Sequence, residues 1–423
     1  MERLRQRLFP GILIGLLLLA NLVSMNEKPA VTPTPAPQGD QGATVAYPDL
    51  PGRLIFRSGN ELQQLADRKL RSIALPTPFA LPGDARTAFA PNGNWVAGFT
   101  RQGDQSFLDA VDLASGAVTR LGSSEPGEML WSPDSQQLAV WAGSRLEIFG
   151  FNRGNRLVQG GDGVRLTQAV WAPDGKRLAM EVTPPSAETS TIEVLDLSSP
   201  TGFERITQPT SHPFWAPNGE GLIFGRYVQE GSLATELVLR KPDGHEVILA
   251  RVADLLQANP EVADIQGAIP HLTSIQGGYN PAEILFTLKF YSDVNPRFAI
   301  GSVNLPGTPV HLHLLPVFPD HPQNQNQTPP RPCYPGALYR SEASLLFVAH
   351  GFGCEGLVGR LEYSSLVPLK DVWTAPIGLV APDGDYVLNQ PAPGAMPTVT
   401  GLLSGGSTKM IPLYGEPIHW DRG

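Results

Sequence analysis

Charge is scarce in this chain, and basic charge is the scarcer kind. Lys, Arg, Asp and Glu together make up 17% of the 423 residues, against roughly 25% in an average soluble protein. The formal net charge is −9, and Lys and Arg are concentrated only at the N-terminus. Nucleic-acid binding needs a basic surface that neutralises phosphates. We therefore expect no nucleic-acid partner.

Cysteine is also rare. Cys333 and Cys354 are the only two, and both lie in the C-terminal third. Two cysteines without histidines at ligand spacing do not predict a metal site. If the chain is exported, an oxidising environment permits a structural disulfide between them. Two buried free thiols are the alternative.

Only one long hydrophobic run occurs, at 8–24, and it is free of charge. The preceding residues 1–7 carry three arginines and are expected to stay in the cytoplasm as a basic tip. The run is intermediate in length between a signal-peptide core and a full membrane span. Small residues are hard to place at the usual cleavage positions, so we expect an uncleaved single-pass anchor. A cleaved signal peptide, and hence a secreted protein, is the alternative.

The anchor is followed at 25–46 by a segment rich in Pro, Thr, Ala and Gln, with almost nothing to bury. This composition predicts a disordered, semi-rigid linker. The linker would hold a domain at 47–423 away from the membrane, on its extracytoplasmic side. All further sequence signals lie in that domain.

One phrase recurs along the domain, in its clearest form as "VWAPDGKRLAM". An aromatic residue precedes Pro and Asp or Asn, and an alternating apolar run follows. Pro presets φ for a turn, Asp or Asn caps the turn, and Gly accepts a positive φ, so the phrase predicts a hairpin between two strands. The four clear copies are centred on prolines spaced 42, 40 and 44 residues apart, which are Pro91, Pro133, Pro173 and Pro217.

A period of 40–45 residues with four strands per unit predicts the blades of a β-propeller. The fold class is therefore all-β, a closed propeller of four-stranded antiparallel blades preceded by one hydrophobic helix. Counting weaker copies gives eight blades, with seven as the alternative. The first unit lacks a proper first strand, and we expect the C-terminal strand at 416–421 to complete it and close the ring.

The phrase resembles the repeat of the TolB-like propellers, which belong to the bacterial envelope. Trp131-Ser132-Pro133-Asp134 and Trp171-Ala172-Pro173-Asp174-Gly175 carry the resemblance, which covers 47–423. It implies an envelope propeller and no catalytic residues. Where TolB carries a separate N-terminal domain, this chain has an anchor and a linker.

The aromatic residues of the phrase are expected to be structural, packed between neighbouring blades. No catalytic, cofactor-binding or metal-binding residue is predicted. The glycine-rich "GFGCEG" at 351–356 is followed by an expected strand rather than a helix, so it does not predict a dinucleotide site. His311 and His313 share one face of an expected strand but have no further ligands nearby. The structural tryptophans are Trp131, Trp171, Trp215 and Trp420.

The two longest irregular segments, Ala250–Pro270 and Pro316–Gly336, connect successive blades. Blade connections share the face opposite the Pro-Asp-Gly turns. Long loops in compact domains are often functional, so we expect this face to bind a partner. Neutral insertions on a tolerant scaffold are the alternative.

These features together predict a non-enzymatic binding or scaffold propeller, tethered to the cell membrane. Its partner would be an unidentified protein of the cell envelope, and the chain itself would be a monomer. The alternative, from another class, is an enzyme or small-ligand sensor that uses the central funnel of the propeller.

Overall fold

The computed structural model divides the chain into two compact units, residues 1–44 and residues 45–423. Everything described below belongs to the second unit. The structure describes residues 46–151, 156–159, 163–187, 189–199, 203–206, 208–228, 234–258, 269–277, 281–291, 297–305, 311–314, 335–340, 345–349, 357–362, 365–373, 379–382, 386–390, 395–401, 408–413 and 415–422.

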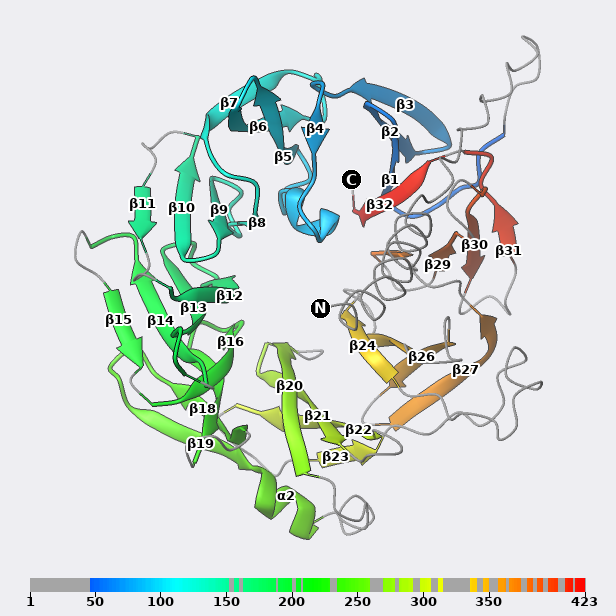
Figure 1. Cartoon of the computed structure of the whole chain (residues 1–423). Coiled ribbons are helices and arrows are strands. Elements are labelled where there is room, and N and C mark those ends of the chain that lie inside the picture. The colour runs from blue at the N-terminus through cyan, green and yellow to red at the C-terminus, as the bar shows by residue number, and fades with distance from the viewer. Residues whose placement is uncertain are drawn as a thin grey trace, which may run out of the picture. The chain divides into compact units, whose positions relative to one another are not determined.

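Over these residues the strands form eight four-stranded antiparallel sheets. Figure 1 shows them around a ring, with one edge strand of each sheet nearest the centre. The prediction of an all-β protein with four-stranded sheets is confirmed, and the arrangement is that of a β-propeller. Two short helices accompany the strands, η1 (Ala85–Ala88) and α2 (Val252–Ala258).

We number the sheets in chain order. Sheet 1 holds β1 (Arg53–Ser58), β2 (Glu61–Ala66), β3 (Lys69–Ala74) and β32 (Glu416–Asp421). Sheet 2 holds β4 (Phe79–Ala80), β5 (Trp95–Gln102), β6 (Gln105–Asp112) and β7 (Val118–Ser123). Sheet 3 holds β8 (Glu128–Trp131), β9 (Gln137–Ala142), β10 (Arg145–Gly150) and β11 (Arg156–Gln159). Sheet 4 holds β12 (Arg165–Trp171), β13 (Arg177–Thr183), β14 (Thr191–Asp196) and β15 (Phe203–Ile206).

The second half of the unit repeats the same order. Sheet 5 holds β16 (Thr210–Trp215), β17 (Leu222–Tyr227), β18 (Ala234–Arg240) and β19 (Glu246–Arg251). Sheet 6 holds β20 (Ile269–Gly277), β21 (Glu283–Tyr291), β22 (Arg297–Asn304) and β23 (His311–Leu314). Sheet 7 holds β24 (Pro335–Arg340), β25 (Leu345–Ala349), β26 (Leu357–Glu362) and β27 (Ser365–Trp373). Sheet 8 holds β28 (Leu379–Val380), β29 (Tyr386–Asn389), β30 (Thr398–Gly401) and β31 (Thr408–Met410).

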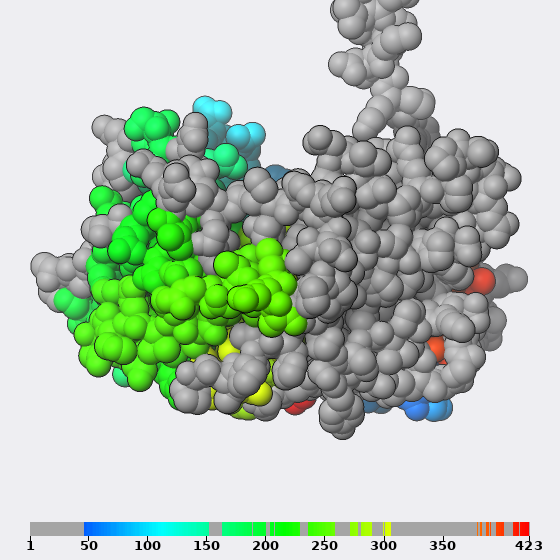
Figure 2. Space-filling view, turned by 90° about the horizontal axis from the view of Figure 1, so that it is seen from below, coloured from blue at the N-terminus to red at the C-terminus, as the bar shows by residue number. Residues whose placement is uncertain are grey.

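No helix among the described residues is both long enough and apolar enough to cross a membrane. The hydrophobic run at 8–24 lies outside the described residues. Helix α2 instead packs on the propeller through its buried residues Val252 and Leu255. Figure 2 shows the domain turned by 90° from the view of Figure 1, so that it is seen from below. Green atoms, which belong to the middle of the chain, cover the left part of this view.

The recurring phrase forms the turn between the first and second strands. In sheets 3 and 4, Oδ1 of Asp134 accepts the backbone N–H of Gln136 at 3.0 Å, and Oδ1 of Asp174 accepts that of Lys176 at 2.9 Å. Asn92 in sheet 2 and Asn218 in sheet 5 make the same contact. The turn therefore needs a side-chain oxygen at this position but not a negative charge.

Tryptophans at the end of the first strand link successive sheets. The Trp131 indole N–H donates to the carbonyl of Ala88 at 2.8 Å. One sheet further on, Trp171 donates to Leu130 at 3.0 Å. Trp215 continues the series by donating to Val170 in sheet 4 at 3.1 Å. All three side chains are buried, so each contact satisfies a polar atom inside an apolar layer between two sheets.

The C-terminal strand β32 pairs antiparallel with β1, so sheet 1 joins the two ends of the propeller domain. Trp420 in β32 is buried among apolar residues of sheets 1 and 8, and its indole donates to the carbonyl of Pro51 at 2.7 Å. Arg53 in β1 pairs with Asp421 in β32 at 2.6 Å and donates to the carbonyl of Gly93 in sheet 2. One arginine thus connects both chain ends with the next sheet.

Burial acts to raise the pKa of Asp421, but hydrogen bonds from His419 and Arg53 outweigh it and hold the pKa below its usual value. A carboxyl with a lowered folded pKa stabilises the fold above its unfolded pKa, about 3.9. That contribution is lost as the pH falls through the lower folded value.

We predict that Trp131→Phe lowers the free energy of unfolding by about 1–3 kcal/mol, because the Ala88 carbonyl loses its donor while most of the apolar contact remains. Urea unfolding of the purified full-length chain measures the change. Trp95→Phe in β5 is the matched control, since its ring is only partly buried. Equal effects of the two substitutions would contradict the role given to the indole hydrogen bond.

We also predict that Asp421→Asn lowers the melting temperature at pH 7, and that parent and variant converge as the pH falls below about 4. Both proteins are heated at a series of pH values while circular dichroism is recorded. A difference that stays constant from neutral to acid pH would show that the Asp421 charge does not stabilise the closure.

Candidate functional site

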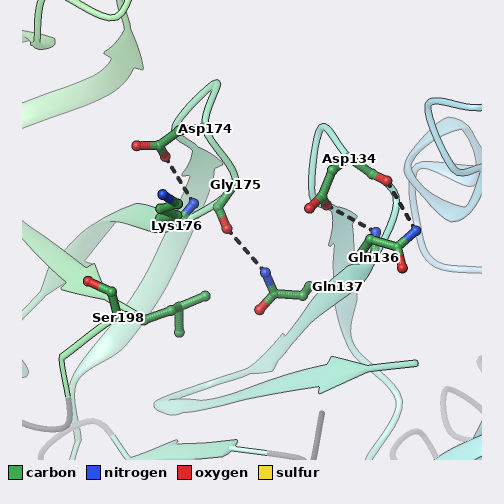
Figure 3. Close-up of a pocket in the computed structure, with 8 residues that line it drawn as sticks. Asp134, Gln136, Gln137, Asp174, Gly175, Lys176 and Ser198 are labelled. Atoms are coloured by element: carbon green, nitrogen blue, oxygen red, sulfur yellow. Dashed lines mark hydrogen bonds between the residues drawn. The ribbon is translucent and has the colours of Figure 1, made fainter. Parts of the chain in front are cut away.

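A cavity of about 500 Å³ opens between sheets 3 and 4. Three turns contribute to it, those between β8 and β9, between β12 and β13, and between β14 and β15 (Figure 3). These are first-to-second and third-to-fourth turns, so the cavity lies on the Pro-Asp-Gly side and not on the side of the long connections. Its lining consists of Asp134, Gln136, Gln137, Asp174, Gly175, Lys176, Leu197 and Ser198.

A direct contact between the β8–β9 turn and the β12–β13 turn shapes the cavity. The side-chain amide of Gln137 donates to the carbonyl of Gly175 at 3.1 Å (Figure 3). Arg53 makes the equivalent contact to Gly93 between sheets 1 and 2. Gly175 has a φ of 65°, which favours glycine. The neighbouring turns are therefore held in fixed positions before any ligand arrives.

The two aspartates of the cavity each have one oxygen committed to the fold. Oδ1 of Asp134 accepts from Gln136 N–H and from the Ser132 hydroxyl, the latter at 2.6 Å. The carboxylate reaches across to the next sheet, where Oδ2 lies 3.5 Å from the position that a Cβ on Gly175 would occupy. Among the described residues, none donates to this Oδ2.

In the Asp174 carboxylate, too, only Oδ1 accepts a hydrogen bond from a described residue. Its Oδ2 lies 3.7 Å from the Arg177 guanidinium, which is longer than a hydrogen bond. That guanidinium lies over the Trp215 ring, 4.5 Å from the ring centroid. Asp196 is the last residue of β14, next to the lining residue Leu197, and its pKa is lowered by hydrogen bonds from the Ser198 side chain and backbone. Asp196 is therefore ionised at neutral pH, and the cavity lining beside it presents two carboxyl groups, two amides, a hydroxyl, one lysine and Leu197.

A second unusual feature lies in the inner strand β16. His212 has a φ of 56°, and the pairing of β16 with β17 is shifted by a bulge at this point. Its Nδ1 lies 2.8 Å from the Ser211 hydroxyl, and its backbone N–H donates to the Glu181 carboxylate at 2.8 Å. Burial lowers the pKa of His212, although the Glu181 charge acts to raise it. The imidazole is therefore neutral at pH 7.

Bulges recur in the inner strands, at β12, β16 and β20. In β12 and β20 the extra residue is a threonine, whose hydroxyl donates to a carbonyl of the adjacent strand at 3.2 Å in both cases. Sheet 5 carries His212 instead, beside the buried Thr210, whose hydroxyl has no hydrogen-bond partner among the described residues. Backbone strain in a non-glycine residue clusters at functional sites, and a buried polar atom without a partner calls for an explanation.

The third strands carry a repeated buried acid that the sequence analysis missed. Asp109 in β6 is 2% exposed and accepts hydrogen bonds from Thr100 and Arg120. Glu147 and Glu193 occupy the same place in β10 and β14, each paired with an arginine. The signal was an acid between apolar residues, as in "LDAV", "LEIF" and "IEVL". Because each acid has its arginine inside the same sheet, these pairs are structural.

Several residues considered in the sequence analysis lie outside the described part of the chain. Cys333, Cys354 and the glycine-rich segment 351–356 are among them. Strand β23 contains His311 and His313, whose side chains are also outside it. Within the described residues, no three His, Cys, Asp or Glu side chains gather in a way that could hold a metal ion.

No family model and no curated protein matches this chain. Solved structures do match, at low identity. Dihydro-heme d1 dehydrogenase NirN in complex with DHE is 14% identical, with 90% of this chain and 77% of that chain covered and a TM-score of 0.52. An oligogalacturonate lyase in complex with manganese is 12% identical, with coverages of 87% and 98% and a TM-score of 0.49. TolB from Acinetobacter baumannii is 14% identical, with 62% of each chain covered and a TM-score of 0.33.

These likenesses concern the fold alone, and they correct one expectation. From the sequence we expected a protein without enzymatic activity, because the repeated phrase is structural. That inference is contradicted, since the dehydrogenase NirN is among the structures with this fold. A repeat that specifies blades leaves the chemistry of the propeller open, because function depends on the residues around the scaffold.

We predict that His212→Gly unfolds with a free energy about 1 kcal/mol higher than His212→Ala. Both variants lose the imidazole contacts, but only glycine relieves the positive φ. Urea unfolding of the two proteins compares them directly. If alanine were as stable as glycine, His212 would not be strained, and the argument for a functional bulge would lose its main support.

Proposed function

We propose that this chain is an extracytoplasmic propeller, held at the cell membrane by residues 8–24, that binds a protein partner on its Pro-Asp-Gly side. The eight sheets would be the eight blades of one closed ring, and residues 25–46 would be the spacer between ring and membrane. The chain itself would act as a monomer. The hydrophobic run and the Pro/Thr-rich segment support the tether.

The observation that carries the binding proposal is the cavity between sheets 3 and 4. Small-molecule pockets are lined mainly by apolar and aromatic side chains. This cavity offers Leu197 as its apolar side chain, among two carboxylates, two amides, an ammonium and a hydroxyl. Asp134, Gln136 and Lys176 are exposed. A rigid, polar and accessible lining suits the surface of another protein better than it suits an apolar ligand.

The long connections support a second surface on the opposite side, the one that the sequence favoured. Helix α2 is the described part of the first connection, and its outward residues Asp254 and Gln257 are exposed. A partner would meet short, regular turns on one surface and a helix with long connections on the other. They can be distinguished because they lie on opposite sides of the sheets.

Ligand binding or catalysis at the inner strands is the second candidate function. It is favoured by the strained, neutral His212 and the unsatisfied Thr210 hydroxyl beside it. A neutral imidazole can accept a proton at physiological pH, as a general base does. This function would use residues of sheets 4 and 5 that the turn cavity does not share.

The proposal predicts where a partner can be crosslinked. Photo-reactive residues are placed in living cells at Gln136 and Lys176 in the cavity, at Asp254 in α2, and at Asp243 in the turn between β18 and β19. Discrete adducts from the two cavity positions, and none from Asp243, are expected. Adducts from Asp254 alone would move the binding surface to the connections. No adduct from any position would favour the inner-strand candidate.

A further inference from the structure

Two copies of the recurring turn contain an Asn–Gly bond. Asn92–Gly93 lies in the turn of sheet 2 and Asn218–Gly219 in that of sheet 5, and the sequence has no other Asn–Gly bond. Asparagine is a thermolabile residue, and glycine makes it more so, because no β-carbon hinders attack of the glycine nitrogen on the asparagine side chain. Both asparagines are exposed to solvent. The surrounding structure therefore decides which of the two bonds reacts.

Within the turn, the two bonds are held in the same way. The side-chain oxygen of Asn92 accepts the N–H of Asn94 at 2.9 Å, and that of Asn218 accepts the N–H of Glu220 at 3.0 Å. The glycine N–H donates to the carbonyl three residues earlier, at 2.8 Å in sheet 2 and 2.9 Å in sheet 5. Attack by the glycine nitrogen breaks these bonds in both turns, so they do not distinguish the two sites.

The turn of sheet 2 is held in addition by both neighbouring sheets. From sheet 1, Arg53 donates to the carbonyl of Gly93 at 2.5 Å. From sheet 3, the Ser135 hydroxyl accepts the backbone N–H of Asn92 at 3.0 Å. A β-carbon on Gly93 would lie only 2.6 Å from the Arg53 guanidinium, so the bond has little space around it. Rotation of Asn92 toward the glycine nitrogen has to break both contacts.

The turn of sheet 5 lacks the corresponding contact from the preceding sheet. Arg177 begins the second strand of sheet 4, as Arg53 and Gln137 begin those of sheets 1 and 3. The latter two donate to the glycine carbonyl in the turn of the next sheet. Arg177 instead lies over the Trp215 ring, 4.5 Å from the ring centroid. Beyond the chain neighbours of Gly219, no described atom lies within 4 Å of the position that a β-carbon there would occupy.

We infer that Asn218 is a site of spontaneous deamidation in the folded protein and that Asn92 is protected from it. The Gly219 nitrogen attacks Cγ of Asn218 and gives up its proton, and ammonia leaves, so that a succinimide ring forms. Water then opens the ring at one of its two carbonyls and gives aspartate or isoaspartate. The net reaction is hydrolysis of the side-chain amide to a carboxylate and an ammonium ion.

The two products have different effects on the turn. Aspartate preserves it, since Asp134 and Asp174 make the same backbone contact in sheets 3 and 4. This product adds one negative charge to the Pro-Asp-Gly side. Isoaspartate inserts a methylene group into the backbone and displaces the side-chain oxygen that caps the turn. The modification therefore changes the charge of this side in one product and the shape of the turn in the other.

Peptide mass spectrometry of the full-length chain in detergent tests the inference. The folded protein is incubated at mildly alkaline pH and digested at acidic pH, and the deamidated fraction is followed at each asparagine. Asn218 is expected to react about tenfold faster than Asn92, because two further hydrogen bonds restrain Asn92. In the chain unfolded in urea, the two rates should be similar, since both bonds are Asn–Gly. Equal rates in the folded protein, or faster reaction at Asn92, would overturn the inference.

Ser135→Gly is the variant that tests the protection of Asn92. It removes the hydroxyl that accepts the Asn92 N–H, and it places in sheet 3 the glycine that sheets 2, 4 and 5 have at this position. Ser135 has a φ of 59°, which glycine adopts without strain, so the turn should be preserved. Deamidation at Asn92 should rise about threefold while Asn218 stays unchanged. An unchanged rate at Asn92 would show that sheet 3 does not protect it, against the inference.

Discussion

The interaction on which the structure depends is the packing of each four-stranded sheet against the next. A single sheet of this size has two apolar faces and cannot bury both alone. The buried side chains accordingly form layers between successive sheets, as the clusters around Trp131, Trp171 and Trp215 show. Indole hydrogen bonds cross each of these layers. The pairing of β32 with β1 extends the same scheme to the two ends of the domain.

The same neighbour contact creates the candidate site. Turns that are short within one sheet come close to the turns of the next, and Gln137 fixes one such pair at the Gly175 carbonyl. The cavity is therefore formed by two sheets together. Because the sheets are rigid, the cavity is rigid too. Its charge is independent of its shape, since asparagine serves the equivalent turns elsewhere.

Much of the fold could be predicted because the determinants are local and repeated. Pro133 and Asp134 specify a turn within a few residues, and alternation specifies the flanking strands. The cavity could not be predicted this way, because it depends on contacts between residues about 40 positions apart. The positive φ of His212 leaves no mark in the sequence. The buried acids were visible in the third strands, but a charge in a strand is ordinarily expected at the surface.

The central claim is that the Pro-Asp-Gly side between sheets 3 and 4 is the binding surface. The most direct measurement is a structure of the full-length chain in complex with its crosslinked partner. We predict that the partner covers Gln136 and Lys176 and fills the turn cavity between sheets 3 and 4. A partner seated on α2 and the long connections, with the turn cavity open to solvent, would contradict it.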